Sequence, residues 1–148
     1  MALGLLNLDI APVRGNAALL PNQPILHTCV VDGSQEGTLV PGDVVTLATG
    51  GAADKVIVKK AAVTDEPIGV VVGNPVKTGW VAGEHISVFP ANSYVYMEAA
   101  GAVARGAKLQ FTAAGKVDDT TEETYKFIGR AYTAAAADGD LVIVHVGE

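Results

Sequence analysis

Residues 138–146 read DGDLVIVHV, and residues 82–90 read AGEHISVFP. Each segment has a glycine, then an acidic residue, then a run in which valine or isoleucine recurs at every second position. Glycine supplies the backbone conformation of a tight turn, and this alternation predicts a β-strand with a buried face. The chain carries the same turn-and-strand signal twice, which predicts a duplicated β unit.

Further matches in the same order extend the two segments into repeats of about residues 39–90 and 104–146. The spacings are shorter in the second repeat, as expected when loops shorten on a shared scaffold. The recurring features are Gly42 and Gly106, Lys55-Val56 and Lys116-Val117, Ile68-Gly69 and Ile128-Gly129, and Gly83 and Gly139.

Many short apolar runs separated by glycine-rich turns predict an all-β fold, a small β-barrel or β-sandwich (β-tulip-like) built from two related β units. The last run is apolar on both faces of the expected strand. Such a strand is central in its sheet, or its outer face is covered by a partner. Val142, Val144 and Val146 fall on one face, and Leu141, Ile143 and His145 fall on the other.

Residues 1–37 differ from the all-β domain expected at residues 38–148, because prolines at positions 12, 21 and 24 interrupt any helical period. We expect an extended N-terminal arm, with one strand at residues 25–31. The alternative is that this strand and a surface loop belong to the barrel itself. The start of the arm is apolar, so we expect it to be mobile when free and to order as an added strand on a partner. Its apolar residues are Leu3, Leu5, Leu6, Leu8 and Ile10.

The composition excludes several classes of partner. The 148 residues carry a net charge of −6, which argues against nucleic-acid binding and against a polybasic membrane surface. No run approaches the roughly 18 apolar residues of a membrane-spanning helix. The N-terminus lacks the basic residues of a signal peptide, and the single cysteine, Cys29, excludes an internal disulfide. We expect a soluble protein made in the cytoplasm.

The residues that carry chemistry form no recognisable catalytic or metal-binding motif. The metal-ligand candidates are His27, Cys29, His85 and His145; of these, His27 and Cys29 are two residues apart and would share a strand face. The acidic run at residues 118–123 lacks the order of a calcium loop and reads as a solvated loop. We therefore expect no enzyme activity, no cofactor and no metal.

Two other functions stay open. A β-barrel or β-clip module that binds a ligand or carbohydrate needs a hollow lined by aromatic residues. Cleavage at Gly33-Ser34 would indicate a self-processing enzyme on a duplicated barrel, although a surface turn is the simpler interpretation. The aromatic candidates are Trp80, Tyr94, Tyr96 and Tyr125.

The segments PGDVVTL (41–47), EPIGVVV (66–72) and AGEHISVF (82–89) resemble the lambda-type head decoration proteins and related capsid-cement families of tailed phages. The resemblance covers roughly residues 39–146. It implies an all-β homotrimer on the outer capsid surface of a virion, made in the host cytoplasm, which clamps neighbouring major capsid protein subunits. Arms in that family order on the capsid, so the five apolar arm residues are expected contacts. Trp80 lies in a segment expected to be a loop, and we expect it to contact a partner as well.

Overall fold

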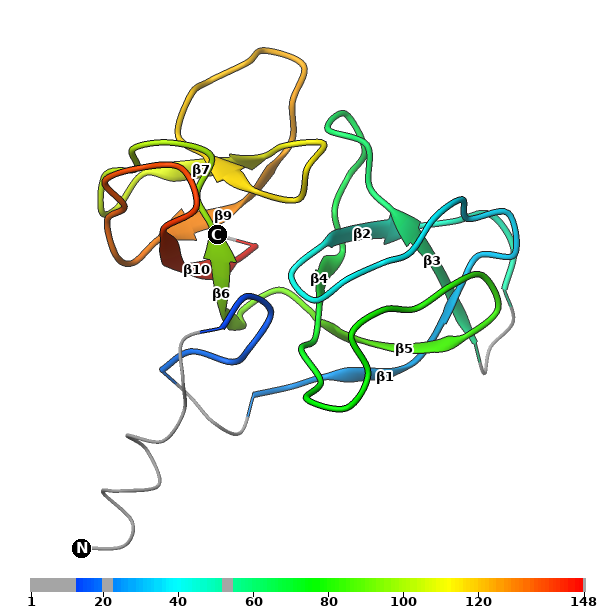
Figure 1. Ribbon diagram of the computed structural model, residues 1–148. Coiled ribbons are helices and arrows are strands. Elements are labelled where there is room, and N and C mark those ends of the chain that lie inside the picture. Colours follow the sequence, from blue (N-terminus) through cyan, green and yellow to red (C-terminus); the bar gives the residue numbers. More distant parts are fainter. Residues whose placement is uncertain (1–12, 20–22, 52–54, 148) are drawn as a thin grey trace, which may run out of the picture.

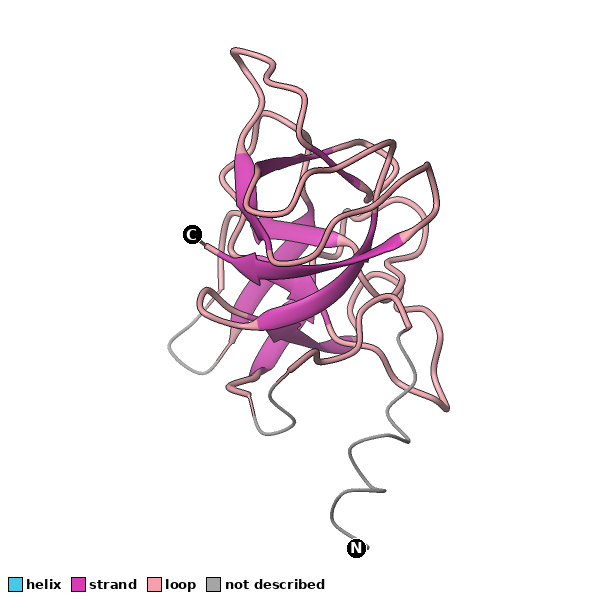
Figure 2. Cartoon of the chain, turned by 90° about the vertical axis from the view of Figure 1, so that its left-hand side faces the viewer, coloured by secondary structure: helices cyan, strands magenta, loops and turns pink. Residues whose placement is uncertain are grey.

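The structure is a computed structural model that describes residues 13–19, 23–51 and 55–147. The described residues form strands, turns and isolated bridges, with no helix among them (Figures 1 and 2). The all-β fold predicted from the sequence is confirmed. The strands are β1 (Leu26–Val31), β2 (Val44–Leu47), β3 (Val56–Lys60), β4 (Gly69–Val71), β5 (His85–Phe89), β6 (Tyr94–Glu98), β7 (Lys108–Phe111), β8 (Val117–Asp118), β9 (Phe127–Ala131) and β10 (Leu141–Val146).

The first five strands form a closed barrel in the order β1-β3-β2-β4-β5. Strand β1 closes it, because it pairs parallel with β3 and antiparallel with β5. Residues 26–31 are therefore a barrel strand, and the barrel begins ahead of the boundary at residue 38 that the sequence indicated. Residues 1–12, which include the apolar start of the expected arm, lie outside the described part of the chain.

The last five strands repeat this arrangement. They form a sheet in the order β6-β10-β9-β7-β8, which matches β1-β5-β4-β2-β3 strand for strand. A parallel bridge between Ala99 and Val117 joins β6 to β8 and stands where the β1–β3 pairing stands in the first barrel. The two halves of the chain form separate neighbouring lobes in Figure 1. We call the closed barrel the first barrel, and we call the five-stranded sheet, whose edges meet at the Ala99–Val117 bridge, the second barrel.

Main-chain register fixes which residues of the two barrels correspond. Val45 pairs with Gly69 in the first barrel, and Leu109 pairs with Gly129 in the second. The turn glycines also correspond: Gly42 and Gly106 have φ of 87° and 86°. A positive φ of this size is easy for glycine and costly for other residues, which explains why these glycines recur in the sequence.

The expected match between the two Lys-Val dipeptides is wrong by two residues. Leu47 pairs with Val58, and Phe111 pairs with Val117, so Val117 corresponds to Val58 and not to Val56. The Ala99–Val117 bridge agrees, because Val58 makes the matching parallel pair with Val31.

A short segment ahead of β1 joins the two barrels. The amides of Gly15 and Ala18 donate to the carbonyls of Tyr96 and Tyr94 over 2.8 Å each, so this segment adds to the edge of β6. Beside it, Arg14 donates to the carbonyl of Pro41 at 2.6 Å in the first barrel and to the carbonyl of Gly115 at 2.9 Å in the second.

Arg14 also forms a salt bridge of 3.0 Å with Asp43, whose side chain is 2% exposed. Asp43 accepts a second hydrogen bond of 2.9 Å from the amide of Val40. A buried carboxylate needs such partners, because an unpaired buried charge is strongly unfavourable.

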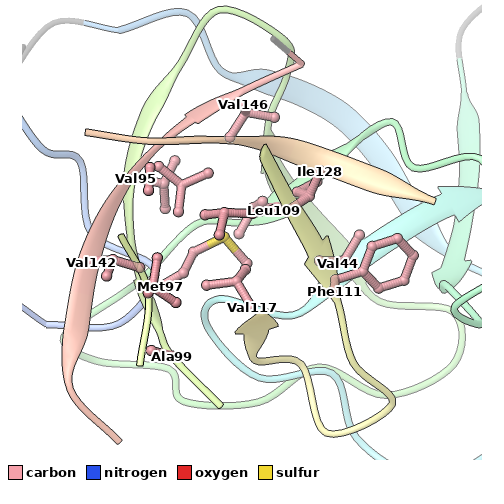
Figure 3. Close-up of a cluster of buried hydrophobic side chains, with 14 of the residues drawn as sticks. Val44, Val95, Met97, Ala99, Leu109, Phe111, Val117, Ile128, Val142 and Val146 are labelled. Carbon is pink, nitrogen blue, oxygen red and sulfur yellow. The ribbon is translucent and has the colours of Figure 1, made fainter. Parts of the chain in front are cut away.

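Two apolar clusters fill the fold. One lies inside the first barrel and includes Cys29, Val58 and Trp80. The other fills the second barrel and extends to the outer side of the first, where Val44, Val70 and Phe89 join it. Figure 3 shows Val44 beside the ring of Phe111, which belongs to the second barrel. The cluster of the second barrel therefore continues across the contact between the two barrels, while the interior of the first barrel has its own cluster.

Candidate interaction surface

Strand β10 is central, as one interpretation of its two-sided apolar pattern predicted. It pairs antiparallel with β6 on one side and with β9 on the other. Its inward valines are buried, while Leu141, Ile143 and His145 on the outward side are half-buried. The outward side is the part of the strand that can meet a partner.

Three aromatic rings gather over this outward side. Tyr94 of β6 lies directly opposite His145 of β10, and their rings stack with centroids 4.6 Å apart. Tyr132, which follows β9, meets Tyr94 edge-on at 5.1 Å and His145 at 5.6 Å. Tyr132 keeps 39% of its surface exposed. The three rings therefore form a contiguous platform in which Tyr132 is the most exposed ring.

Two cationic side chains continue this platform across the sheet. Strand register places Lys108, Arg130, His145 and Tyr94 in one row over β7, β9, β10 and β6. The Lys108 ammonium lies 4.6 Å from the centre of the Phe127 ring, which is 38% exposed. We call the surface formed by Tyr94, Lys108, Phe127, Arg130, Tyr132 and His145 the basic-aromatic face.

The chemistry of the basic-aromatic face is that of a protein interface. Tyrosine, phenylalanine and arginine are enriched at such interfaces because they bury large area around a few directed hydrogen bonds. Arg130 donates to the carbonyl of Gly106 at 2.7 Å, which fixes the direction of its guanidinium. The stems of lysine and arginine also cover apolar surface while their charged ends stay in water.

None of the residues expected at an interface is a described member of the basic-aromatic face. Leu3, Leu5, Leu6, Leu8 and Ile10 fall outside the described residues. Trp80 is only 6% exposed and packs inside the first barrel with Cys29 and Val58. Its main chain exchanges two hydrogen bonds of 2.9 Å with Leu39. The structure therefore places the indole of Trp80 in the core of the first barrel and not in an exposed loop position.

The histidine and cysteine pattern gives no metal site in the described part of the chain, where no cluster of three or more candidate ligands occurs. A shift of register between Leu26 and Cys29 in β1 breaks the alternation, so His27 is exposed and Cys29 is buried. The sequence predicted that the two side chains would share a strand face, and this prediction is wrong. Burial raises the pKa of the Cys29 thiol.

The other polar candidates have local partners. His27 Nδ1 lies 3.3 Å from the Ser87 hydroxyl. Ser34 donates its hydroxyl to the Asp32 carboxylate at 2.9 Å within an exposed turn.

The aromatic residues considered for ligand binding are dispersed. Trp80 lines a hollow of about 210 Å³ together with His27 and His85. Tyr125 lines a separate hollow with Gln110. Tyr94 belongs to the basic-aromatic face. The structure thus does not bring these rings to one concave site.

Sequence reasoning missed Lys108, Phe127, Arg130 and Tyr132. One signal was present, because aligning the two repeats pairs Lys108 with Val44 and Arg130 with Val70. A change from valine to a cationic residue at equivalent positions indicates that this face is buried in the first repeat and more accessible to solvent in the second.

No helix in the described residues is long and apolar enough to cross a bilayer.

Comparison with known proteins gives a similarity in fold. No family model matches the chain, and no curated protein matches it. Among solved structures, the fold is similar to that of the N base of head fiber gp8.5 of bacteriophage phi29, with a TM-score of 0.59 and 17% sequence identity. The similarity covers 84% of this chain and 95% of that one, so it spans both barrels. At this identity the likeness shows a shared fold.

Proposed function

We propose that this chain is a capsid decoration, or cement, protein of a bacteriophage. In this proposal it binds the outer surface of the capsid and stabilises contacts between major capsid protein subunits, as a homotrimer and without catalysis. The observation that carries the proposal is the similarity to the phi29 head fiber base over nearly the whole of both chains. The resemblance of residues 39–146 to capsid-cement families supports the same role.

In the proposed mechanism, the protein stabilises the shell through a contact surface that exists only when capsid subunits are assembled side by side. A protein that contacts two neighbouring capsid subunits binds the assembled state and not the separate subunits. By mass action, such binding stabilises the shell by an amount that grows with the logarithm of the ratio of the decoration protein's concentration to its dissociation constant. This role requires no chemical step.

We assign the capsid contact to the N-terminal segment. Leu6, Leu8 and Ile10 alternate, which suits a strand added to the edge of a partner sheet. The segment leads directly into Arg14 and Gly15, which are fixed on the two barrels. A contact made by residues 1–12 would therefore be coupled to the body of the protein over very few residues.

We expect a gene beside that of this chain to encode a major capsid protein, and capsids assembled from that protein test the proposal. The full chain should sediment with the capsids and raise the temperature at which they rupture. Removing residues 2–12 should weaken binding at least tenfold while the circular dichroism spectrum is unchanged, because the truncation spares Arg14.

Point variants separate a specific contact from general stickiness. Serine at Leu6, Leu8 and Ile10 should reduce binding as the truncation does. Serine at Val76 and Val81, which are 91% and 49% exposed on the first barrel, is the matched control and should leave binding unchanged. Failure of the full chain to sediment with the capsids would contradict the proposed function.

A further inference from the structure

The interface between the two barrels is asymmetric. The first barrel contributes the outward side of β2, β4 and β5, where Val44, Val70 and Phe89 are at most 2% exposed. The second barrel contributes the β7–β8 hairpin, with Phe111 1% exposed and the Gly115 carbonyl bound by Arg14. Different surfaces of two equivalent barrels therefore meet, which is a head-to-tail contact.

Strand register locates the counterpart of each of these two surfaces on the other barrel. Val44 pairs with Val70 and Val70 with Phe89, as Lys108 pairs with Arg130 and Arg130 with His145. The receiving surface of the first barrel thus corresponds to the basic-aromatic face of the second. On that face Lys108 is exposed, and Phe127 is 38% exposed.

The inserting surface has its counterpart on the first barrel. Phe111 corresponds to Leu47, because each is the last residue of its strand and pairs with an equivalent valine. Phe111 is almost fully buried, whereas Leu47 is 57% exposed. Each chain therefore presents both halves of an interface that it already makes once internally.

We propose that copies of this chain associate head to tail, with the end of β2 at Leu47 seated on the basic-aromatic face of the next copy. We assign a second copy as the partner because this contact would repeat the contact between the two barrels of one chain. The exposed Leu47 would take the place of Phe111. The aromatic rings of the basic-aromatic face and the aliphatic stems of Lys108 and Arg130 would pack against it. A heterologous contact of this kind closes into a ring when its rotation permits. The inference deepens the proposed function, since a ring presents several N-terminal segments to one capsid at once.

Light scattering after gel filtration tests the association on the full chain. The wild type should elute as an oligomer, a trimer if the ring has three members, and Leu47→Glu should reduce the mass to that of one chain. Because Leu47 is exposed, this variant should keep the wild-type circular dichroism spectrum. Val76→Glu replaces another exposed apolar residue, 91% exposed, and should leave the mass unchanged.

Cysteine cross-linking tests the predicted pair of surfaces. Val44 lies beside Phe111 within the chain, so Lys108 of one copy should lie beside Leu47 of the next. Under mild oxidation, a mixture of Leu47→Cys and Lys108→Cys proteins should give a covalent dimer, while neither protein alone does. A protein with both changes should give covalent rings, and the native Cys29 is buried and should not interfere.

A monomeric wild type, an unchanged mass for Leu47→Glu, or cross-linking of Leu47→Cys with itself would overturn the inference. Capsid sedimentation is read separately. A monomer that still binds capsids would contradict only the head-to-tail contact, and an oligomer that binds no capsid would contradict only the proposed function.

Discussion

Gly69 and Gly129 hold the same place in the two barrels, and both face a carbonyl at a distance that no side chain tolerates. A Cβ on Gly69 would lie 2.2 Å from the carbonyl oxygen of Phe89. A Cβ on Gly129 would lie 2.1 Å from the carbonyl oxygen of His145, which is the counterpart of Phe89. The Ile-Gly dipeptide thus recurs in the sequence because both barrels contain the same close backbone approach, which only glycine permits.

Alanine at either glycine should therefore destabilise the protein to a similar extent. The obstacle is main chain, which cannot rotate away, and overpacking of this kind typically reduces the free energy of unfolding by about 1–3 kcal/mol. Urea denaturation of Gly69→Ala and Gly129→Ala measures the effect. Gly33→Ala is the control, because a Cβ there would have no neighbour within 4 Å. Wild-type stability in either variant would contradict the equivalence.

The sequence revealed the features of the fold that only glycine can satisfy. Only glycine readily adopts the positive φ found at Gly42 and Gly106, and only glycine fits the close backbone approach at Gly69 and Gly129. Glycine therefore recurs at equivalent positions of the two repeats. Strand β1 was harder to place, because its pairing with β3 and β5 joins residues far apart in the chain. The match between the two Lys-Val dipeptides was wrong because the loops before them differ in length, so a shared dipeptide does not define the strand register.

The bridge between the barrels predicts a second result. Arg14→Ala leaves the Asp43 carboxylate buried without its cation and removes hydrogen bonds to Pro41 and Gly115. Removing one partner of a buried pair costs about 3–5 kcal/mol in the free energy of unfolding. Thermal and urea unfolding of Arg14→Ala should show this loss.

Lys116→Ala is the matched control for Arg14→Ala, because the Lys116 ion pair with Asp138 is exposed to solvent. It should unfold close to the wild type. Equal effects of the two variants would contradict a bridging role for Arg14.

The burial of Trp80 predicts a third result that intrinsic fluorescence reads directly, since the chain has one tryptophan. Its emission should be blue-shifted and poorly quenched by acrylamide, with and without capsids present. Trp80→Ala should reduce the free energy of unfolding by about 3–5 kcal/mol, as for other large aromatic residues removed from a core. Red-shifted, readily quenched emission would instead place the indole on the surface.

The turn ahead of β5 predicts a pH dependence. Glu84 accepts a hydrogen bond of 2.8 Å from the Val81 amide and pairs with Lys77. The Lys77 partner, with the Val81 amide, lowers the pKa of Glu84 below its usual 4.5. A lowered folded-state pKa stabilises the fold above the unfolded-state value, and this stabilisation is lost as pH falls through the folded-state pKa.

Glu84→Gln should therefore be less stable than the wild type at pH 7, and the difference should vanish as the pH falls through the lowered pKa of Glu84. Thermal unfolding at several pH values measures it, with Glu123→Gln in an exposed loop as the control. A difference that is constant with pH would show that the charge of Glu84 makes no contribution.

The interaction surface was only partly accessible to sequence reasoning. The two-sided pattern of residues 141–146 indicated an outward side, and that side carries His145. The burial of Trp80 could not be predicted, because a single tryptophan in a loop has no apolar periodicity around it that indicates burial. The role of Arg14 was hidden, because its partners Asp43 and Gly115 are 29 and 101 residues away. Tyr132 follows β9 as an ordinary loop residue, and only the fold brings it to Tyr94.

Electron cryomicroscopy of capsids incubated with the full chain tests the proposed function most directly. The account predicts density on the outer surface in which each chain appears as two adjacent five-stranded barrels. It also predicts that the N-terminal residues run from Arg14 onto the major capsid protein. Capsids that remain bare at saturating protein concentration would contradict it.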